Sequence, residues 1–177
     1  MGLALFLSLL LSCVSPPQPI SGVQKITALN TFAIGAPAQK ATWTITPRIR
    51  ICATTGISIL RVDRAVKYWE MLGYDFDGIY MDHNINCMEP QYGEIIITLP
   101  EGDMSDHHMA ATRIYTKKST DHIAKAKIFM RPKESRRQRV VEHEIGHALG
   151  WMHYEQKYHI MHSNWFFGGF DAKGLRK

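Results

Sequence analysis

The stretch from His143 to His153 reads His-Glu-Ile-Gly-His-Ala-Leu-Gly-Trp-Met-His and is the most informative part of this chain. His143 and His147 are four residues apart, so on a helix their imidazoles project from one face, one turn apart. If the chain turns back after that helix, His153 can approach as a third metal ligand. Glu144 directly follows the first histidine, where it can accept a proton from a water molecule instead of binding the metal. Three neutral imidazoles and one open position form the ligand set of a catalytic zinc ion.

The complete pattern, H-E-x-x-H-x-x-G-x-x-H, is similar to the signature of the metzincin family of zinc metalloproteases. The run Val141–Gly150 resembles the active-site helix of the matrixin branch, which includes the matrix metalloproteinases, and Gly150 permits the turn that ends this helix. Metzincins also need a methionine in a tight turn shortly after the third ligand, and Met161 stands at a similar spacing. Trp165 occupies the position that, in matrixins, helps to wall the pocket for the residue after the scissile bond, although the usual proline before it is missing.

This resemblance implies an α+β fold with a twisted five-stranded mixed sheet, two long helices and a short irregular C-terminal subdomain that carries the Met-turn. It also implies a zinc-dependent endopeptidase acting on a protein or peptide substrate, with one catalytic Zn2+ and with Glu144 as the general base. The strand around 109–116 would be the antiparallel edge strand above the cleft, where a peptide could pair as an added strand. The alternative is a non-catalytic zinc-binding interaction lipoprotein on a protease scaffold. Loss of Glu144 or of a ligand would favour that alternative, and none is lost.

Six further histidines raise the question of a second metal site, because matrixins hold a structural zinc with three histidines and an aspartate. They are His83, His107, His108, His122, His159 and His162, and Asp106 could supply the aspartate of such a site beside His107, His108 and His122. We expect most of them to be surface or loop residues. His159 and His162 flank the methionine and are expected to line the cleft or to shape its turn. An additional structural zinc or calcium ion is left open.

Hydrophobic periodicity gives the order strand, helix, four strands, helix and an irregular tail. The strand segments are 41–52, interrupted near Pro47, then 76–81, 93–99, 109–116 and 123–130. Residues 58–72 have helical spacing, and Ser135–Gln138 forms a capping box that is expected to open the active-site helix. Three glycines after residue 167 disfavour a C-terminal helix.

The first 13 residues are typical of an export signal. The apolar run Leu3–Leu11 is too short to span a bilayer, and Leu10–Cys13 resembles a bacterial lipobox, in which the cysteine is lipidated. Residues 14–40 contain several prolines and glycines and are expected to form a flexible tether to a catalytic domain at 41–177. These features predict an exported protein, anchored to the membrane through Cys13 if its source is bacterial and otherwise secreted. In the alternative, an ordinary signal peptide is cleaved nearby and Cys13 is incidental.

The three cysteines of the chain are consistent with export. If Cys13 carries lipid, Cys52 and Cys87 are free to form a disulfide. The alternative is two free buried thiols.

Length and composition are those of one small domain. The chain has 177 residues, of which 45% are hydrophobic, and we expect a monomer. The formal net charge is +5, and much of it comes from Lys133, Arg136, Arg137 and Arg139. We interpret these cations as a solvated helix start; the alternative is an attraction to anionic partners. No nucleic-acid motif accompanies the charge, so no nucleic-acid partner is expected.

Overall fold

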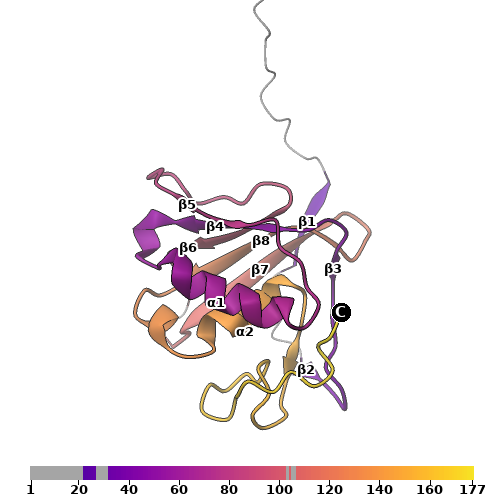
Figure 1. Ribbon diagram of the computed structural model, residues 1–177. Helices are drawn as coiled ribbons and strands as arrows, with labels where there is room; N and C mark the ends of the chain where they lie inside the picture. The colour runs from indigo at the N-terminus through magenta and orange to yellow at the C-terminus, as the bar shows by residue number, and fades with distance from the viewer. Residues whose placement is uncertain (1–21, 27–31, 103, 105–106) are drawn as a thin grey trace, which may run out of the picture.

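The computed structural model describes residues 22–26, 32–102, 104 and 107–177. It is an α+β domain in which a mixed, mostly parallel sheet carries two α-helices on one face (Figure 1), so the α+β class is confirmed. The helices are α1 (Ile59–Glu70) and α2 (Val140–Ala148). The strands are β1 (Val23–Ile26), β2 (Phe32–Ala33), β3 (Thr42–Trp43), β4 (Arg48–Cys52), β5 (Ile79–Asp82), β6 (Glu94–Thr98), β7 (Ala110–Lys117), β8 (His122–Met130) and β9 (His153–Tyr154).

The main sheet has seven strands instead of the five expected from the resemblance. Its order is β1-β7-β8-β6-β4-β5, and β3 pairs with the start of β8. The predicted interruption near Pro47 is present and separates β3 from β4, which pair with different neighbours. Proline lacks the N–H that a continuous strand would need at this position. The other additional strand, β1, comes from the segment that was predicted to be a tether.

Strand β7 is an edge of the sheet over only half of its length. It runs antiparallel to β8, as expected, but β1 pairs with its other side from Ile114 to Lys117. Within the described residues, Ala110–Thr112 have no strand partner on that side. The prediction of an edge strand is therefore wrong for the second half of β7, and for the first half it stays a prediction.

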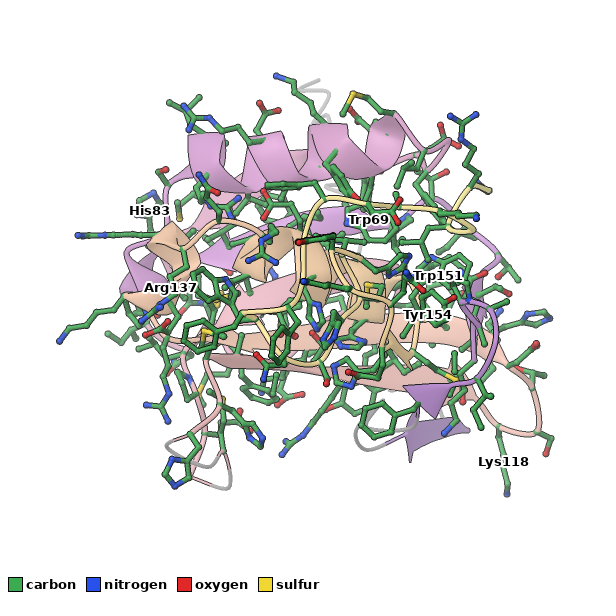
Figure 2. The ribbon with its side chains drawn as sticks, turned by 90° about the horizontal axis from the view of Figure 1, so that it is seen from below. Trp69, His83, Lys118, Arg137, Trp151 and Tyr154 are labelled. Atoms are coloured by element: carbon green, nitrogen blue, oxygen red, sulfur yellow. A yellow bond between two sulfur atoms is a disulfide. The ribbon has the colours of Figure 1, made fainter. Side chains whose placement is uncertain are left out.

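Helix α1 begins and ends where the sequence indicated. The hydroxyl of Ser58 accepts a hydrogen bond from the backbone N–H of Arg61, which caps the helix, and Gly73 takes a left-handed conformation after its end. The buried face of α1 contacts α2. Trp69, seen between the two helices in Figure 2, donates its indole N–H to the carbonyl oxygen of Glu142 at 2.8 Å.

The start of α2 differs from the prediction. Ser135 lies in a short 3-10 helix, Glu134–Arg136, and its hydroxyl donates to the carbonyl oxygen of Pro132 at 2.7 Å. The capping-box interpretation is therefore wrong, because the hydroxyl is engaged with the preceding turn. Helix α2 begins only after Arg139, whose backbone has φ = 72° and interrupts the helical path.

Part of the predicted tether belongs to the folded domain. Besides β1, the short strand β2 pairs with β9, and the backbone N–H of Lys40 donates to the carbonyl oxygen of Gly150 at 2.9 Å. The N–H of Met152 donates to the carbonyl oxygen of Ala38 at 3.0 Å. Residues 32–40 therefore lie along the turn that follows α2.

A disulfide joins Cys52, at the end of β4, to Cys87 in the loop after β5. Cys13 and the predicted export signal lie outside the described residues. In the part of the chain that the structure describes, no helix is both long enough and apolar enough to cross a membrane. After α2 the described chain contains no further helix, as the glycines of the tail suggested.

Candidate metal centre and cleft

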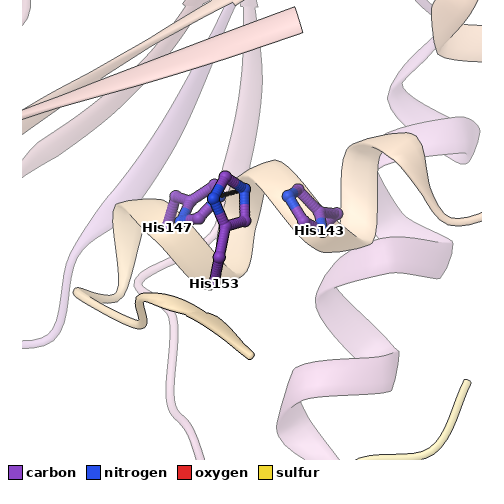
Figure 3. Close-up of side chains that lie close together, drawn as sticks. All are labelled: His143, His147 and His153. Atoms are coloured by element: carbon purple, nitrogen blue, oxygen red, sulfur yellow. Dashed lines mark hydrogen bonds between the residues drawn. The ribbon is translucent and has the colours of Figure 1, made fainter. Parts of the chain in front are cut away.

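Three histidines from the decisive stretch converge at one point of the structure. His143 and His147 project from α2, and His153 approaches from β9 after the intervening turn (Figure 3). One ring nitrogen of each lies within 4.8 Å of the other two. The Nε2 atoms of His147 and His153 are 3.0 Å apart. Tetrahedral zinc, with Zn–N bonds of about 2.0–2.1 Å, needs ligand nitrogens separated by roughly 3.3 Å, so this cluster is of the right size.

The turn that brings back the third histidine is a Schellman motif. The N–H of Trp151 donates to the carbonyl oxygen of Gly146, and the N–H of Gly150 donates to that of His147. Gly150 has φ = 99°, a conformation that side-chain-bearing residues avoid. A Cβ atom at this position would also overlap the carbonyl oxygen of Ala41. The glycine of the motif is therefore required by both conformation and space.

The backbone orients two of the imidazoles for metal binding. Nδ1 of His143 lies 2.8 Å from the carbonyl oxygen of Ile160, and Nδ1 of His147 lies 2.7 Å from that of Trp151. A carbonyl only accepts, so each Nδ1 carries the proton and each Nε2 has a free lone pair. The Nδ1 atom of His153 is buried and has no hydrogen-bond partner among the residues that the structure describes.

Burial also keeps these side chains neutral. It lowers the pKa of His143 to about 3, assisted by the neighbouring His153, and it lowers the pKa of His147 well below its ordinary value. Burial likewise lowers the pKa of His153. A neutral imidazole offers the lone pair that a metal requires, so the donor set fits a zinc ion.

Glu144 lies on α2 between the two helical histidines and is held by a residue that the sequence analysis missed. The hydroxyl of Thr112 on β7 donates to Oε2 of Glu144 at 2.6 Å. Burial raises the pKa of Glu144 to about 7, and the hydrogen bond from Thr112 opposes this rise. A carboxyl group with such a pKa is suited to accept and return a proton near neutral pH.

Met161 is fully buried and lies against α2 between the histidines. The absence of a side chain at Gly146 makes room for it, because a Cβ atom there would overlap the Met161 sulfur and crowd the ring of Trp69. The preceding turn is shaped by His159, whose Nδ1 accepts the backbone N–H of Met161 at 3.1 Å. His159 therefore shapes the turn, which is one of the two roles considered for it.

We expect Met161→Ala to destabilise the domain by about 2–5 kcal/mol, because it removes a buried side chain and leaves a void beneath α2. Met161→Leu nearly conserves volume and should cost less than about 1.5 kcal/mol. Thermal unfolding and zinc affinity of the two variants give the comparison. If Met161→Ala unfolds and binds zinc like the wild type, then Met161 does not support the histidines.

The three histidines open onto a cavity of about 620 Å3. Its walls include β7 and the residues just before it, α2 with the preceding residue, and the chain between Ile160 and Trp165. Phe32 of β2 also lines it, with its ring centroid 5.9 Å from that of His153. The volume is in the range of ligand-binding clefts, about 300–1,000 Å3.

Trp165 lines this cavity, where the resemblance placed a pocket wall. Its indole N–H donates to the carbonyl oxygen of Gln138 at 3.0 Å. A second hydrogen bond joins the same two segments, because the Arg139 guanidinium donates to the carbonyl oxygen of Trp165 at 2.9 Å. The interpretation of Arg139 as part of a solvated helix start is wrong, because its side chain contributes to the cavity wall.

The remaining histidines do not assemble a second centre. Among the described residues, the three histidines above are the only group of three or more potential ligand residues close enough to share an ion. His107, His108 and His162 line the cavity, whereas His83 and His122 lie elsewhere. Asp106, a further candidate ligand, lies outside the described residues.

Taken together, the centre has three convergent neutral nitrogens, a carboxyl group beside them and an adjoining cavity. Such an arrangement can bind a divalent cation and move a proton next to it. No protein-family model matches the chain, and no curated protein matches it.

Proposed function

We propose that the protein is a zinc-dependent endopeptidase of the metzincin type, with His143, His147 and His153 as zinc ligands. The observation that carries this proposal is the convergence of the three imidazoles beside Glu144 in one cavity. The ligand set fits catalytic zinc, which uses three protein ligands and leaves one position open. The spacing of the motif, the buried Met161 and the tryptophan of the cavity wall give further support.

Zinc bound at this centre would polarise the substrate carbonyl and lower the pKa of water. Glu144 accepts the proton of the attacking water molecule and passes it to the leaving amine. Thr112 restricts the rotation of the Glu144 carboxyl group, so the proton acceptor is oriented before substrate binds. Among the described residues, Ala110–Thr112 pair only with β8, and we propose that the other side of this stretch offers backbone groups with which an extended peptide can pair next to Glu144.

The proposal is tested with purified, zinc-loaded protein and a mixed peptide library. We expect one zinc ion per chain and peptide hydrolysis that a chelator abolishes and added zinc restores. His147→Ala should lose both the zinc and the activity, because two imidazoles bind zinc much more weakly than three. His122→Ala, far from the cavity, is the matched control and should keep both.

Two results would contradict the proposal. If correctly folded wild-type protein contains no zinc and does not take it up, the three histidines are not a zinc site. Bound zinc without hydrolysis of any library peptide would instead favour the non-catalytic interaction module, since that alternative also needs the ligands but has no use for Glu144.

We also propose that the protein is exported. A disulfide between Cys52 and Cys87 supports this, because such bonds persist mainly in oxidising compartments. Whether Cys13 is a lipid anchor is tested by mass spectrometry of the mature chain from a bacterial host. A soluble chain that starts elsewhere and carries no fatty acid would favour a plain signal peptide.

A further inference from the structure

The side chain of Arg139 is built into the wall of the cavity, one helical turn before the first zinc ligand. The backbone N–H of His143 donates to the Arg139 carbonyl oxygen at 2.8 Å, which sets this spacing. The guanidinium carbon lies 5.1 Å from the centre of the Trp165 ring. On another side it approaches Gly168, where a Cβ atom would lie 2.6 Å from Nη1. Tryptophan and glycine therefore hold the cation in a defined place.

This cation has no carboxylate partner among the described residues. Its side chain makes one hydrogen bond, to the carbonyl oxygen of Trp165, and a guanidinium has five N–H groups to donate. The nearest acid in sequence, Glu142, is engaged by both of its oxygens with Arg61, at 2.8 and 2.7 Å. Glu155 pairs with His162 and does not line the cavity. A half-buried cation that lines a cavity and has no carboxylate partner among the described residues can be stabilised by an anionic ligand.

The backbone at Arg139 gives an independent reason to assign a role to its side chain. Its φ of 72° is in the left-handed region, where glycine and asparagine are favoured and other residues are strained. Glycine would serve better if the position had only to make the turn into α2. The strained residue is instead an arginine, and this arginine lines the cavity beside the metal centre.

We propose that Arg139 selects substrates with an acidic side chain, aspartate or glutamate, at the residue that follows the scissile bond. The inference rests on the proposed endopeptidase function, and it adds the substrate class. Val140, Ile160 and Trp165 provide apolar walls for the stem of that side chain. Its carboxylate then replaces water as the partner of the free guanidinium N–H groups, in a charge-assisted hydrogen bond.

Arg137 offers a matched comparison within the same loop. Its guanidinium carbon also lies over the Trp165 ring, at 5.3 Å from the centroid. It is paired with Glu134, however, and it does not line the cavity. If the two arginines only stabilised the loop around Trp165, replacing either one would change peptide cleavage to a similar extent. If Arg139 binds the acidic side chain of the substrate, only its replacement changes the preference for acidic peptides.

The test uses three peptides that differ only in the residue after the scissile bond, which is Glu, Gln or Leu. We expect kcat/KM for the Glu peptide to exceed that for the Gln peptide by about 10- to 100-fold, the range of a hydrogen bond to a charged group. Arg139→Gln should abolish this ratio, and Arg137→Gln should leave it as in the wild type. Equal cleavage of the Glu and Gln peptides by the wild type, or an Arg139→Gln variant that slows all three equally, would overturn the assignment.

A binding measurement separates this inference from the proposed function. Zinc-loaded Glu144→Gln protein, which should bind peptides without cleaving them, is titrated with the Glu and Gln peptides with and without Arg139→Gln. We expect about tenfold tighter binding of the Glu peptide that disappears in the double variant. If the wild type cleaves none of the peptides but this binding preference persists, the endopeptidase proposal fails and the role of Arg139 stands. If the Glu and Gln peptides bind equally well, Arg139 only stabilises the loop around Trp165 and the inference is wrong.

Discussion

Glu144→Gln is expected to lower kcat/KM for peptide hydrolysis by about 10²- to 10⁴-fold, the usual contribution of a general acid-base group. Glutamine keeps the shape of the side chain and can still accept the hydrogen bond from Thr112, but it cannot take a proton. Because Glu144 is not a ligand, the zinc content should stay at one ion per chain. Removing a buried carboxyl group with a raised pKa should also leave the free energy of unfolding unchanged or slightly higher. Steady-state kinetics, metal analysis and denaturant unfolding give the three readouts.

Glu142→Gln is the matched control, two residues earlier on the same helix. Its carboxylate forms a two-point ion pair with Arg61, with only 6% of the residue exposed. Replacing it leaves the Arg61 cation without its partner and should destabilise the fold by about 3 kcal/mol, the lower end of the cost of breaking a buried pair. Below its unfolding temperature, this variant should retain hydrolysis. If Glu144→Gln keeps most of its activity, or if both variants lose it equally, Glu144 is not the proton acceptor.

Gly150→Ala is expected to destabilise the domain by about 2–5 kcal/mol and to weaken zinc binding. The left-handed conformation costs a residue with a Cβ about 1–2 kcal/mol. The overlap with the carbonyl oxygen of Ala41 adds about 1–3 kcal/mol, as in other overpacked sites. Relieving the overlap requires the turn that carries His153 to move relative to Ala41, and we expect this to displace the third ligand. Denaturant unfolding and zinc titration measure the two effects.

Gly56→Ala is a control that separates the cost of the left-handed backbone conformation from the cost of the steric overlap. Gly56 also has a left-handed backbone, with φ = 65°, but a Cβ atom there would meet nothing within 4 Å. It should cost only the conformational part, about 1–2 kcal/mol, and leave zinc binding as in the wild type. Equal effects of the two glycine substitutions on stability and on zinc would contradict the proposed packing of the turn on Ala41.

Several features of the centre were predictable because they depend on short-range geometry. Two histidines four residues apart meet on any helix, whatever surrounds it. Gly150 was identifiable as the end of that helix, and the Schellman hydrogen bonds agree. The capping of α1 by Ser58 is local in the same way. The start of α2 was predicted wrongly because the Ser135 hydroxyl can either cap a helix or donate to the carbonyl oxygen of Pro132. Both hydrogen bonds are local, and the structure has the second.

The cavity wall could not be predicted, since its residues are far apart in the sequence. Thr112 reaches Glu144 only because β7 packs above α2, and strand placement depends on pairings that span the whole chain. Arg139 looked like a surface cation because its neighbours in sequence are charged. Its unusual backbone conformation and the return of the chain at Trp165 direct it to the cavity instead.

By itself, the sequence determined the α+β class, the segments that form α1 and most strands, and the spacing of the three histidines and Glu144 on a helix and its turn. These depend on periodicity, caps and the chirality of the backbone, which act over a few residues. The tertiary structure alone decided that residues 32–40, which have the composition of a tether, support the turn before His153 through backbone hydrogen bonds. Every residue except proline carries both backbone hydrogen-bonding groups, so their pairing leaves no mark in composition and depends on which segments the folded chain brings together.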